Sequence, residues 1–163
     1  MRAAQTIQNK LLTPADLLKK IAQWKVLNKS IAFTNGCFDI LHQGHIASLM
    51  EAASHADFLI VGLNTDDSVK KLKGPLRPIN KEQSRALVLA ALCMVDAVVL
   101  FGEDTPRELI IQLKPDVLVK GGDYKIEEIA GATEVQSWGG KVVINPTLPG
   151  YSTTDIINRT SAQ

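Results

Sequence analysis

The sequence predicts an α/β fold of the doubly wound type, in which helices cover both faces of a parallel sheet. Two observations support this fold class. Short apolar runs with strand character alternate with stretches of helical spacing from residue 31 onward. Polar segments directly follow three of the apolar runs, and two of these segments contain glycine. Right-handed crossovers between parallel strands place helices on both faces and gather such segments at the carboxyl edge of the sheet.

The expected elements begin with an amphipathic helix, because Thr13 is suited to cap it and Pro14 to open its first turn. A βαβ unit follows, with strands at 31–33 and 58–63 around a helix at 44–56. Residues 64–80 are polar, contain Pro and Gly, and predict a long loop. We then expect helices at 82–94, 106–113 and 126–138, strands at 97–101, 116–119 and 141–144, and a C-terminal helix opened by Ser152.

The composition fits one globular domain over residues 1–163, with a helical extension at 1–30 and the α/β core at 31–163. Eighteen Lys and Arg against 17 Asp and Glu give a net charge of +1, which provides no general attraction for nucleic acid or an anionic membrane. Cys37 and Cys93 form no metal-binding pattern and are too few for a disulfide framework, so we expect a cytoplasmic protein. No apolar stretch approaches the roughly 18 residues of a membrane span.

The segment after the first predicted strand carries the most informative chemistry. Gly36 allows backbone N–H groups to face a ligand, and the helix starting near Gly44 adds the positive end of its dipole. His42 and His45 can both donate hydrogen bonds to one phosphate group. The alternatives are a pair of structural caps or a zinc site, and zinc is disfavoured because no third His or Cys has ligand spacing. A phosphate is the expected ligand.

Basic and hydroxyl side chains occupy three further segments. Lys70, Lys71, Lys73 and Arg77 could screen phosphate charge from a closing loop, although a solvated loop is the alternative. Asp123 follows paired glycines and could accept a hydrogen bond from a base, ribose or sugar hydroxyl, or simply close a tight turn. Three hydroxyls at 152–154 open a predicted helix and suit an anion, whereas a plain N-cap needs only one.

Residues 34–45 are similar to the G-x-F-D-x-x-H-x-G-H signature of the cytidylyltransferase-like nucleotidyltransferase superfamily. The chain more closely resembles the heptose 1-phosphate adenylyltransferase family, through residues 33–39, 72–74, 77–80, 103–106, 119–124 and 150–154. This resemblance covers nearly the whole chain. It implies a Rossmann-like, five-stranded parallel sheet in the order 3-2-1-4-5 with an extra N-terminal helix. Tyr151 departs from the isoleucine usual in the superfamily, and Pro149 stands where cytidylyltransferases carry R-T-E-G, which argues against glycerol 3-phosphate or ethanolamine phosphate as substrates.

The resemblance implies transfer of AMP from ATP to D-glycero-β-D-manno-heptose 1-phosphate with Mg²⁺, giving ADP-heptose and pyrophosphate. The implied catalytic residues are His42, His45 and Lys73. Contacts to the nucleotide and its phosphates are implied for Thr34, Asn35, Gly36, Phe38, Lys120, Gly122, Asp123, Ser152, Thr153 and Thr154. Contacts to the acceptor are implied for Asp39, Asn64, Arg77 and Arg85, where Arg85 could instead brace the site. Asp39 and Asp123 are candidate metal ligands.

The resemblance also implies partners and a pathway. Members of the family are commonly dimers or larger assemblies, so we expect a homo-oligomer. The kinase half found in longer relatives is absent from this sequence, so we expect the kinase and a phosphatase to be separate proteins. The product would serve lipopolysaccharide inner core or another heptose-containing glycan. Two alternatives stay open: a superfamily member with another phosphorylated acceptor, and a nucleotide-sensing module without turnover.

Overall fold

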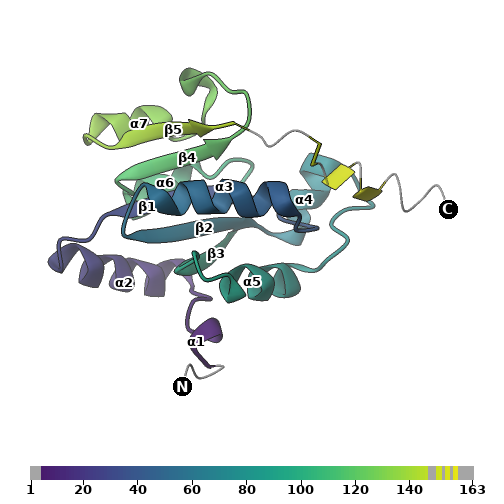
Figure 1. Ribbon diagram of the computed structural model, residues 1–163, viewed down its shortest axis with the longest axis horizontal. Helices are drawn as coiled ribbons and strands as arrows, with labels where there is room; N and C mark the ends of the chain where they lie inside the picture. Colours follow the sequence, from purple (N-terminus) through teal and green to yellow (C-terminus); the bar gives the residue numbers. More distant parts are fainter. Residues whose placement is uncertain (1–4, 147–149, 152, 155, 158–163) are drawn as a thin grey trace.

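The computed structural model describes residues 5–146, 150–151, 153–154 and 156–157. Its strands are β1 (Ile31–Gly36), β2 (Phe58–Asn64), β3 (Ala97–Phe101), β4 (Val117–Gly121) and β5 (Lys141–Asn145). They form one sheet in the order β3-β2-β1-β4-β5, and every neighbouring pair is parallel (Figure 1). The doubly wound sheet and the strand order expected from the sequence are confirmed.

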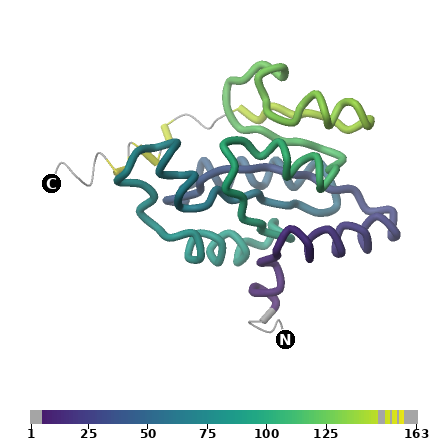
Figure 2. The backbone as a smooth tube through the Cα atoms, turned by 180° about the vertical axis from the view of Figure 1, so that it is seen from behind, coloured from purple at the N-terminus to yellow at the C-terminus, as the bar shows by residue number. Residues whose placement is uncertain are grey.

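Helices cover both faces of this sheet. On one face, α2 (Pro14–Val26), α6 (Arg107–Leu113) and α7 (Ala132–Ser137) share a core cluster with the strands. On the other face, α3 (Gln43–Ser54) and α5 (Glu82–Ala91) contribute to a second cluster. Figure 1 shows α3 in front of the sheet, and Figure 2 shows the molecule from behind with α6 in front. Three short elements complete the described chain: α1 (Gln5–Gln8), α4 (Asp66–Lys73) and the 3-10 turn η1 (Ile126–Glu128).

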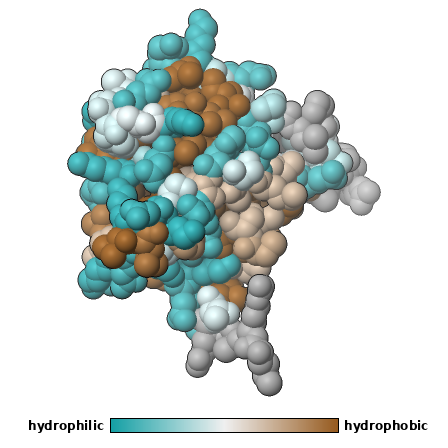
Figure 3. All heavy atoms as spheres, turned by 60° about the vertical axis from the view of Figure 1, so that its left-hand side comes forward, coloured by the Kyte–Doolittle hydropathy of each residue, from teal (hydrophilic) through white to brown (hydrophobic). Residues whose placement is uncertain are grey.

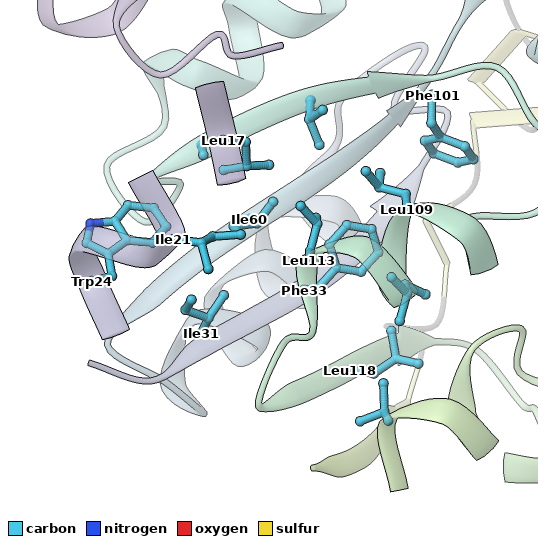
Figure 4. Close-up of a cluster of buried hydrophobic side chains, with 14 of the residues drawn as sticks. Leu17, Ile21, Trp24, Ile31, Phe33, Ile60, Phe101, Leu109, Leu113 and Leu118 are labelled. Carbon is cyan, nitrogen blue, oxygen red and sulfur yellow. The ribbon is translucent and has the colours of Figure 1, made fainter. Parts of the chain in front are cut away.

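The N-terminal helix α2 is part of the core. Its buried residues Leu17, Ile21 and Trp24 lie in one core cluster with Ile31 of β1 and Ile60 of β2, and Figure 4 shows Ile21 beside Ile60. The Trp24 ring also stacks on the ring of Phe58 with centroids 4.2 Å apart. Burial of large apolar side chains is the main favourable term in folding. Helix α2 therefore contributes to the stability of the fold by covering apolar residues on one face of the sheet.

A close approach between β1 and β2 explains a glycine in the middle of the sheet. The Phe33 ring is fully buried, and a Cβ atom built at Gly62 would lie 2.7 Å from its Cζ atom. Any side chain at position 62 would displace this ring. Gly62 therefore allows the largest side chain of β1 to lie across the neighbouring strand.

The loop predicted at 64–80 contains a helix, so that prediction was wrong for residues 66–73. The Thr65 hydroxyl accepts a hydrogen bond from the Ser68 N–H at 3.4 Å, and Val69 is fully buried. The helix ends at Gly74, whose φ is +97°. Apolar and polar residues are well separated around this helix, but it is strongly polar overall, with two aspartates in its first turn and three lysines in its last. This polar composition is what suggested a loop.

One further prediction differs from the structure, and one element has no counterpart among the predictions. The helix predicted at 126–138 is divided into η1 and α7, and Gly131 precedes α7 with φ at +88°. Helix α1 was not predicted. Ser152, where the C-terminal helix was predicted to begin, lies outside the described residues.

On the face shown in Figure 3, hydrophobic side chains form separate patches among hydrophilic ones. Within the described part of the chain, no helix has the length and apolar character needed to cross a membrane.

Candidate functional site

A cavity of about 840 Å³ lies at the carboxyl ends of β1, β2 and β4. This is the edge at which the sequence predicted the functional segments to meet. Its lining includes thirteen predicted site residues from five parts of the chain: Thr34, Asn35, Gly36, Phe38, Asp39, His42, His45, Asn64, Lys73, Arg77, Lys120, Thr153 and Thr154.

His42 and His45 form a stacked pair at the start of α3. Their ring centroids are 3.9 Å apart and the rings are inclined by 28°. His42 is the N-cap residue of α3, but its side chain makes no capping hydrogen bond, which removes the structural-cap interpretation for this residue. The Nδ1 atoms of both rings are buried and have no hydrogen-bond partner among the described residues. Since buried polar atoms are normally paired, these two nitrogens indicate a polar ligand at this point.

The buried surroundings favour the neutral form of both histidines. Burial lowers the pKa of His42. Burial lowers the pKa of His45 to about 4, and the neighbouring His42 adds to this shift. Near pH 7 each neutral ring then offers one N–H donor and one acceptor. An anion bound beside the rings would raise both pKa values, because it stabilises the imidazolium form.

Three cationic side chains line the same cavity. Lys73 ends α4, Arg77 lies in the following loop, and Lys120 lies near the end of β4. The Lys120 Nζ donates a hydrogen bond to the Asn35 Oδ1 at 3.2 Å and lies 5.7 Å from the centroid of the Tyr124 ring. Burial lowers the pKa of Lys120. Four carboxylates also line the cavity, at Asp39, Glu51, Asp104 and Glu128, so the cavity as a whole is not positively charged. Any attraction for an anion comes from the local positions of the three cationic side chains.

The Asp39 carboxylate is held by the loop at 74–81. It accepts hydrogen bonds from the Arg77 Nε at 2.6 Å, the Ile79 N–H at 2.8 Å and the Asn80 N–H at 2.8 Å. Its side chain is only 1% exposed. Burial raises the pKa of Asp39, but the backbone donors of Asn80 and Ile79 and the Arg77 guanidinium outweigh it, so the pKa is lowered overall. The carboxylate therefore stays charged and connects the segment after β1 to the loop that carries Arg77.

Arg85 connects the segment after β1 to the loop at 74–81 from the buried side of these segments. Its guanidinium donates to the Cys37 carbonyl at 2.6 Å, the Asn80 carbonyl at 2.9 Å and the Asp66 carboxylate at 2.7 Å. Its side chain is 1% exposed, and Arg85 is not among the described residues that line the cavity. Of the two roles considered from the sequence, this geometry matches bracing of the site.

Gly122 and Asp123 lie at a smaller neighbouring cavity of about 470 Å³. Tyr124 and Glu128 line both cavities, so the two are adjacent. Gly122 has φ at +127°, and a Cβ atom there would lie 2.7 Å from the Tyr124 ring. The glycine lets that ring fold back over the turn, so Asp123 lies beside the main cavity and not in it.

The C-terminal segment reaches the cavity from the far end of the chain. The Thr153 hydroxyl donates to the Ile40 carbonyl at 3.4 Å, and Thr154 lines the cavity. Ser152 lies outside the described residues. Sequence reasoning did not include Tyr151 or Tyr124 among the site residues. Tyr151 was noted as a departure from the superfamily pattern, but its stacking on the His42 ring depends on contacts across the fold that one sequence does not reveal.

The sequence of this chain is similar to those of several curated proteins. The bifunctional protein HldE of Hyphomonas neptunium is 56% identical over 149 residues, which are 91% of this chain and 31% of that protein. HldE of Koribacter versatilis is 53% identical over 152 residues, which are 93% of this chain and 31% of that protein. The chain therefore spans about a third of the length of these curated relatives.

Solved structures share the fold. The crystal structure of a lipopolysaccharide core biosynthesis protein from Thermoplasma volcanium is 32% identical with a TM-score of 0.60, covering 74% of this chain and 97% of that one. A pantoate-beta-alanine ligase from Francisella tularensis, 16% identical with a TM-score of 0.62, covers 93% of this chain and 76% of that one and supports the fold alone. Residues 33–159 match the model of the cytidylyltransferase-like family. Because this match spans most of the sequence, the chain belongs to the cytidylyltransferase-like family.

Proposed function

We propose that this chain is an adenylyltransferase that transfers AMP from ATP to D-glycero-β-D-manno-heptose 1-phosphate. One observation carries the proposal: two stacked histidines, three cationic side chains and the C-terminal threonines Thr153 and Thr154 line a single cavity at the carboxyl edge of the sheet. Such a cavity suits two phosphorylated substrates whose negative charges must be brought together. The heptose acceptor is supported by the identity of 50% or more with HldE proteins and by the heptose-family segments in the sequence.

The proposed reaction is an in-line displacement at phosphorus. A phosphate oxygen of heptose 1-phosphate attacks the α-phosphorus of ATP and forms a new P–O bond. The bond from the α-phosphorus to the oxygen that bridges to the β-phosphate breaks, and pyrophosphate takes that oxygen and its electron pair. The nucleophile is already an anion, so no general base is needed. Catalysis then consists of positioning the two phosphates and stabilising the charge of the transition state.

Each group of residues has a proposed part in this reaction. The N–H groups of His42 and His45 donate to oxygens of the α-phosphate, and Lys73 neutralises its charge. The Thr154 hydroxyl donates to the leaving pyrophosphate, and the Thr153 hydroxyl does so after it turns away from the Ile40 carbonyl. Arg77 has its Nε atom paired with Asp39, which leaves the other two guanidinium nitrogens for the acceptor phosphate. Lys120 and Asn35 lie at the nucleotide side of the cavity.

Mg²⁺ is proposed to enter with ATP. The described residues contain no group of three or more His, Cys, Asp or Glu side chains that could hold a metal ion. Mg²⁺ does not require one, because it keeps several waters and binds through substrate phosphates with one or two carboxylates. When bound, it would neutralise phosphate charge. Asp39, a candidate ligand from the sequence, already accepts hydrogen bonds from three residues, and Asp123 is the more accessible carboxylate.

The test is pyrophosphate release from the full chain, with Mg²⁺ and heptose 1-phosphate and with ATP, CTP, GTP or UTP in parallel. We expect release with ATP that depends on the heptose phosphate. The variant Lys70→Ala serves as a control, because Lys70 pairs with Asp67 on exposed α4 and does not line the cavity. Release with CTP in place of ATP would overturn the adenylyl assignment. ATP binding without release would favour the nucleotide-sensing alternative. Oligomeric state, cytoplasmic location and supply by a separate kinase and phosphatase stay predictions.

A further inference from the structure

The C-terminal segment is joined to the start of α3 through Tyr151. The Tyr151 hydroxyl donates a hydrogen bond to the Gln43 Oε1 at 2.7 Å. Its ring lies nearly parallel to the His42 ring, with an interplanar angle of 22° and centroids 6.3 Å apart. Gln43 is the first residue of α3 and directly follows His42. One tyrosine thus contacts both the histidine pair and the helix that positions it.

These contacts extend a row of rings from the protein interior to the surface. Phe38 is buried, and its ring is tilted at 54° against the His45 ring with centroids 5.3 Å apart. His45 stacks on His42, and Tyr151 follows on the other side of His42. Aromatic rings attract one another at such separations and angles. The position of each histidine is therefore limited on both sides, by Phe38 inside and Tyr151 outside.

Gly44 makes this arrangement possible. A Cβ atom built at Gly44 would lie 3.1 Å from the Cε1 and Nδ1 atoms of His42 and 3.1 Å from the Cβ atom of Tyr151. These distances are tighter than ordinary contacts, so a side chain at position 44 would push the His42 ring or Tyr151 back by a few tenths of an ångström. Glycine therefore allows the closest approach between Tyr151 and the start of α3.

We infer that Tyr151 is a positioning residue, which fixes the phosphate-binding threonines Thr153 and Thr154 relative to His42 and His45. The inference deepens the proposed function and rests on it. A triphosphate that spans the cavity must meet the histidines at its α-phosphate and the threonines at its outer phosphates. Tyr151 precedes those threonines by two and three residues, and its hydroxyl is hydrogen-bonded to Gln43 at the start of α3, next to the histidines. Its side chain is 43% exposed, so it contributes little to the core, and a role in core stability does not account for these contacts.

The first test is independent of any substrate. The chain has only three histidines, so their imidazole Hε1 signals can be assigned by NMR with single His→Gln variants. Tyr151→Leu removes the ring next to His42, and we expect the His42 signal to shift while the His55 signal stays in place. Tyr151→Phe keeps the ring, and we expect the His42 signal close to its original position. An unmoved His42 signal in Tyr151→Leu would overturn the inference.

The second test measures the hydrogen bond between Tyr151 and Gln43. Tyr151→Phe and Gln43→Ala each remove it, and we expect either variant to lower kcat/KM for ATP by about fivefold, the factor that corresponds to a neutral hydrogen bond of about 1 kcal/mol. The double variant should be no worse than either single one, because both remove the same bond. A loss of about 25-fold in the double variant would mean independent effects and would overturn the inference.

The controls separate positioning from stability and from the proposed function. Gln83→Ala changes an exposed glutamine in the first turn of α5, away from the cavity, and should leave kcat/KM unchanged. Melting temperatures of Tyr151→Phe and Gln43→Ala should fall by no more than about 2–4 °C, the effect of losing one neutral hydrogen bond, and a larger loss of stability would contradict positioning. If the original protein releases no pyrophosphate, the proposed function fails. The role of Tyr151 is then still decided by the NMR test and by the ATP affinities of the same variants.

Discussion

His42 and His45 are the two side chains on which the proposed chemistry depends most. Replacing either one by alanine removes a donor to the α-phosphate, which gains charge in the transition state. Loss of one such donor typically lowers kcat by about 10²–10³-fold. We expect His42→Ala to reach this range while the dissociation constant for ATP changes much less, as measured by steady-state kinetics and calorimetry.

His55 provides the matched control, because it lies at the other end of α3 and does not line the cavity. His55→Ala should retain full kcat. Equal losses of ATP affinity and kcat in His42→Ala would contradict a role specific to the transition state, because they would mean that the histidine binds substrate and transition state alike.

The buried His45 also makes stability depend on pH. Its pKa is about 4 in the folded protein against the ordinary 6.5. Between these values the unfolded chain binds more protons than the folded one, so the free energy of unfolding rises with pH through this window. The stabilising contribution is complete above pH 6.5 and is lost as the pH falls toward 4.

We expect the melting temperature of His45→Gln to change less than that of the original protein when the pH is lowered from 6.5 to 4, because glutamine does not titrate. His55→Gln controls for the loss of an imidazole elsewhere on α3. Parallel melting curves for His45→Gln and the original protein across this pH range would show that His45 is not the group responsible.

At the scale of the elements, Arg85 of α5 joins three segments that form one wall of the site. Arg85→Met would leave the Asp66 carboxylate and the carbonyls of Cys37 and Asn80 without their donor. The Asp66 carboxylate is partly exposed, but each buried acceptor that is left without its donor costs about 1–3 kcal/mol in unfolding free energy. Urea unfolding should show a loss of this size, whereas Lys81→Met, one turn earlier and exposed, should show almost none. A loss below about 1 kcal/mol in Arg85→Met would contradict bracing by this residue.

The alternation of elements was predictable, because buried parallel strands have continuous apolar runs that a single sequence displays. All five strands and the helices α2, α3, α5 and α6 follow from such runs and from helical spacing. Helix α4 was missed because it is stabilised mainly by the Thr65 cap and the buried Val69, with few apolar residues on its surface. The Pro and Gly residues after it suggested a loop for the whole stretch, although they mark only its end.

The site was predictable where strand-end segments meet, since the topology of a parallel sheet brings these ends together. Thirteen of the predicted residues line one cavity for this reason. The burial of individual side chains and their hydrogen-bond partners were not predictable from one sequence. The sequence left two roles open for Arg85, contact with the acceptor or bracing of the site, and only the structure shows that it is buried while Arg77 lines the cavity. The same limit applies to Tyr151, whose contacts join positions 108 residues apart.

At the scale of the whole molecule, a net charge of +1 provides no general attraction for an anion, so ATP must be held by local contacts in the cavity. ATP that binds there should stabilise the fold by mass action. At a concentration of about 100 times its dissociation constant, a ligand that binds only the folded state adds about 2.7 kcal/mol. For a domain of this size that is a rise in melting temperature of roughly 5–10 °C.

Differential scanning calorimetry with increasing ATP and Mg²⁺ measures this rise. We expect the shift to grow with the logarithm of ATP concentration, and to be smaller at equal concentration in Lys120→Ala, whose lost ammonium lies beside Asn35 in the cavity. A melting temperature that does not respond to ATP would contradict a nucleotide site in this cavity.

The most direct measurement follows the oxygen that forms the new bond. Heptose 1-phosphate with ¹⁸O at its non-bridging phosphate oxygens is incubated with ATP, Mg²⁺ and the protein, and the products are analysed by mass spectrometry. Attack by the sugar phosphate on the α-phosphorus of ATP predicts that every label is retained in ADP-heptose and that the released pyrophosphate carries none. Labelled pyrophosphate, or consumption of ATP without formation of ADP-heptose, would contradict adenylyl transfer to this acceptor.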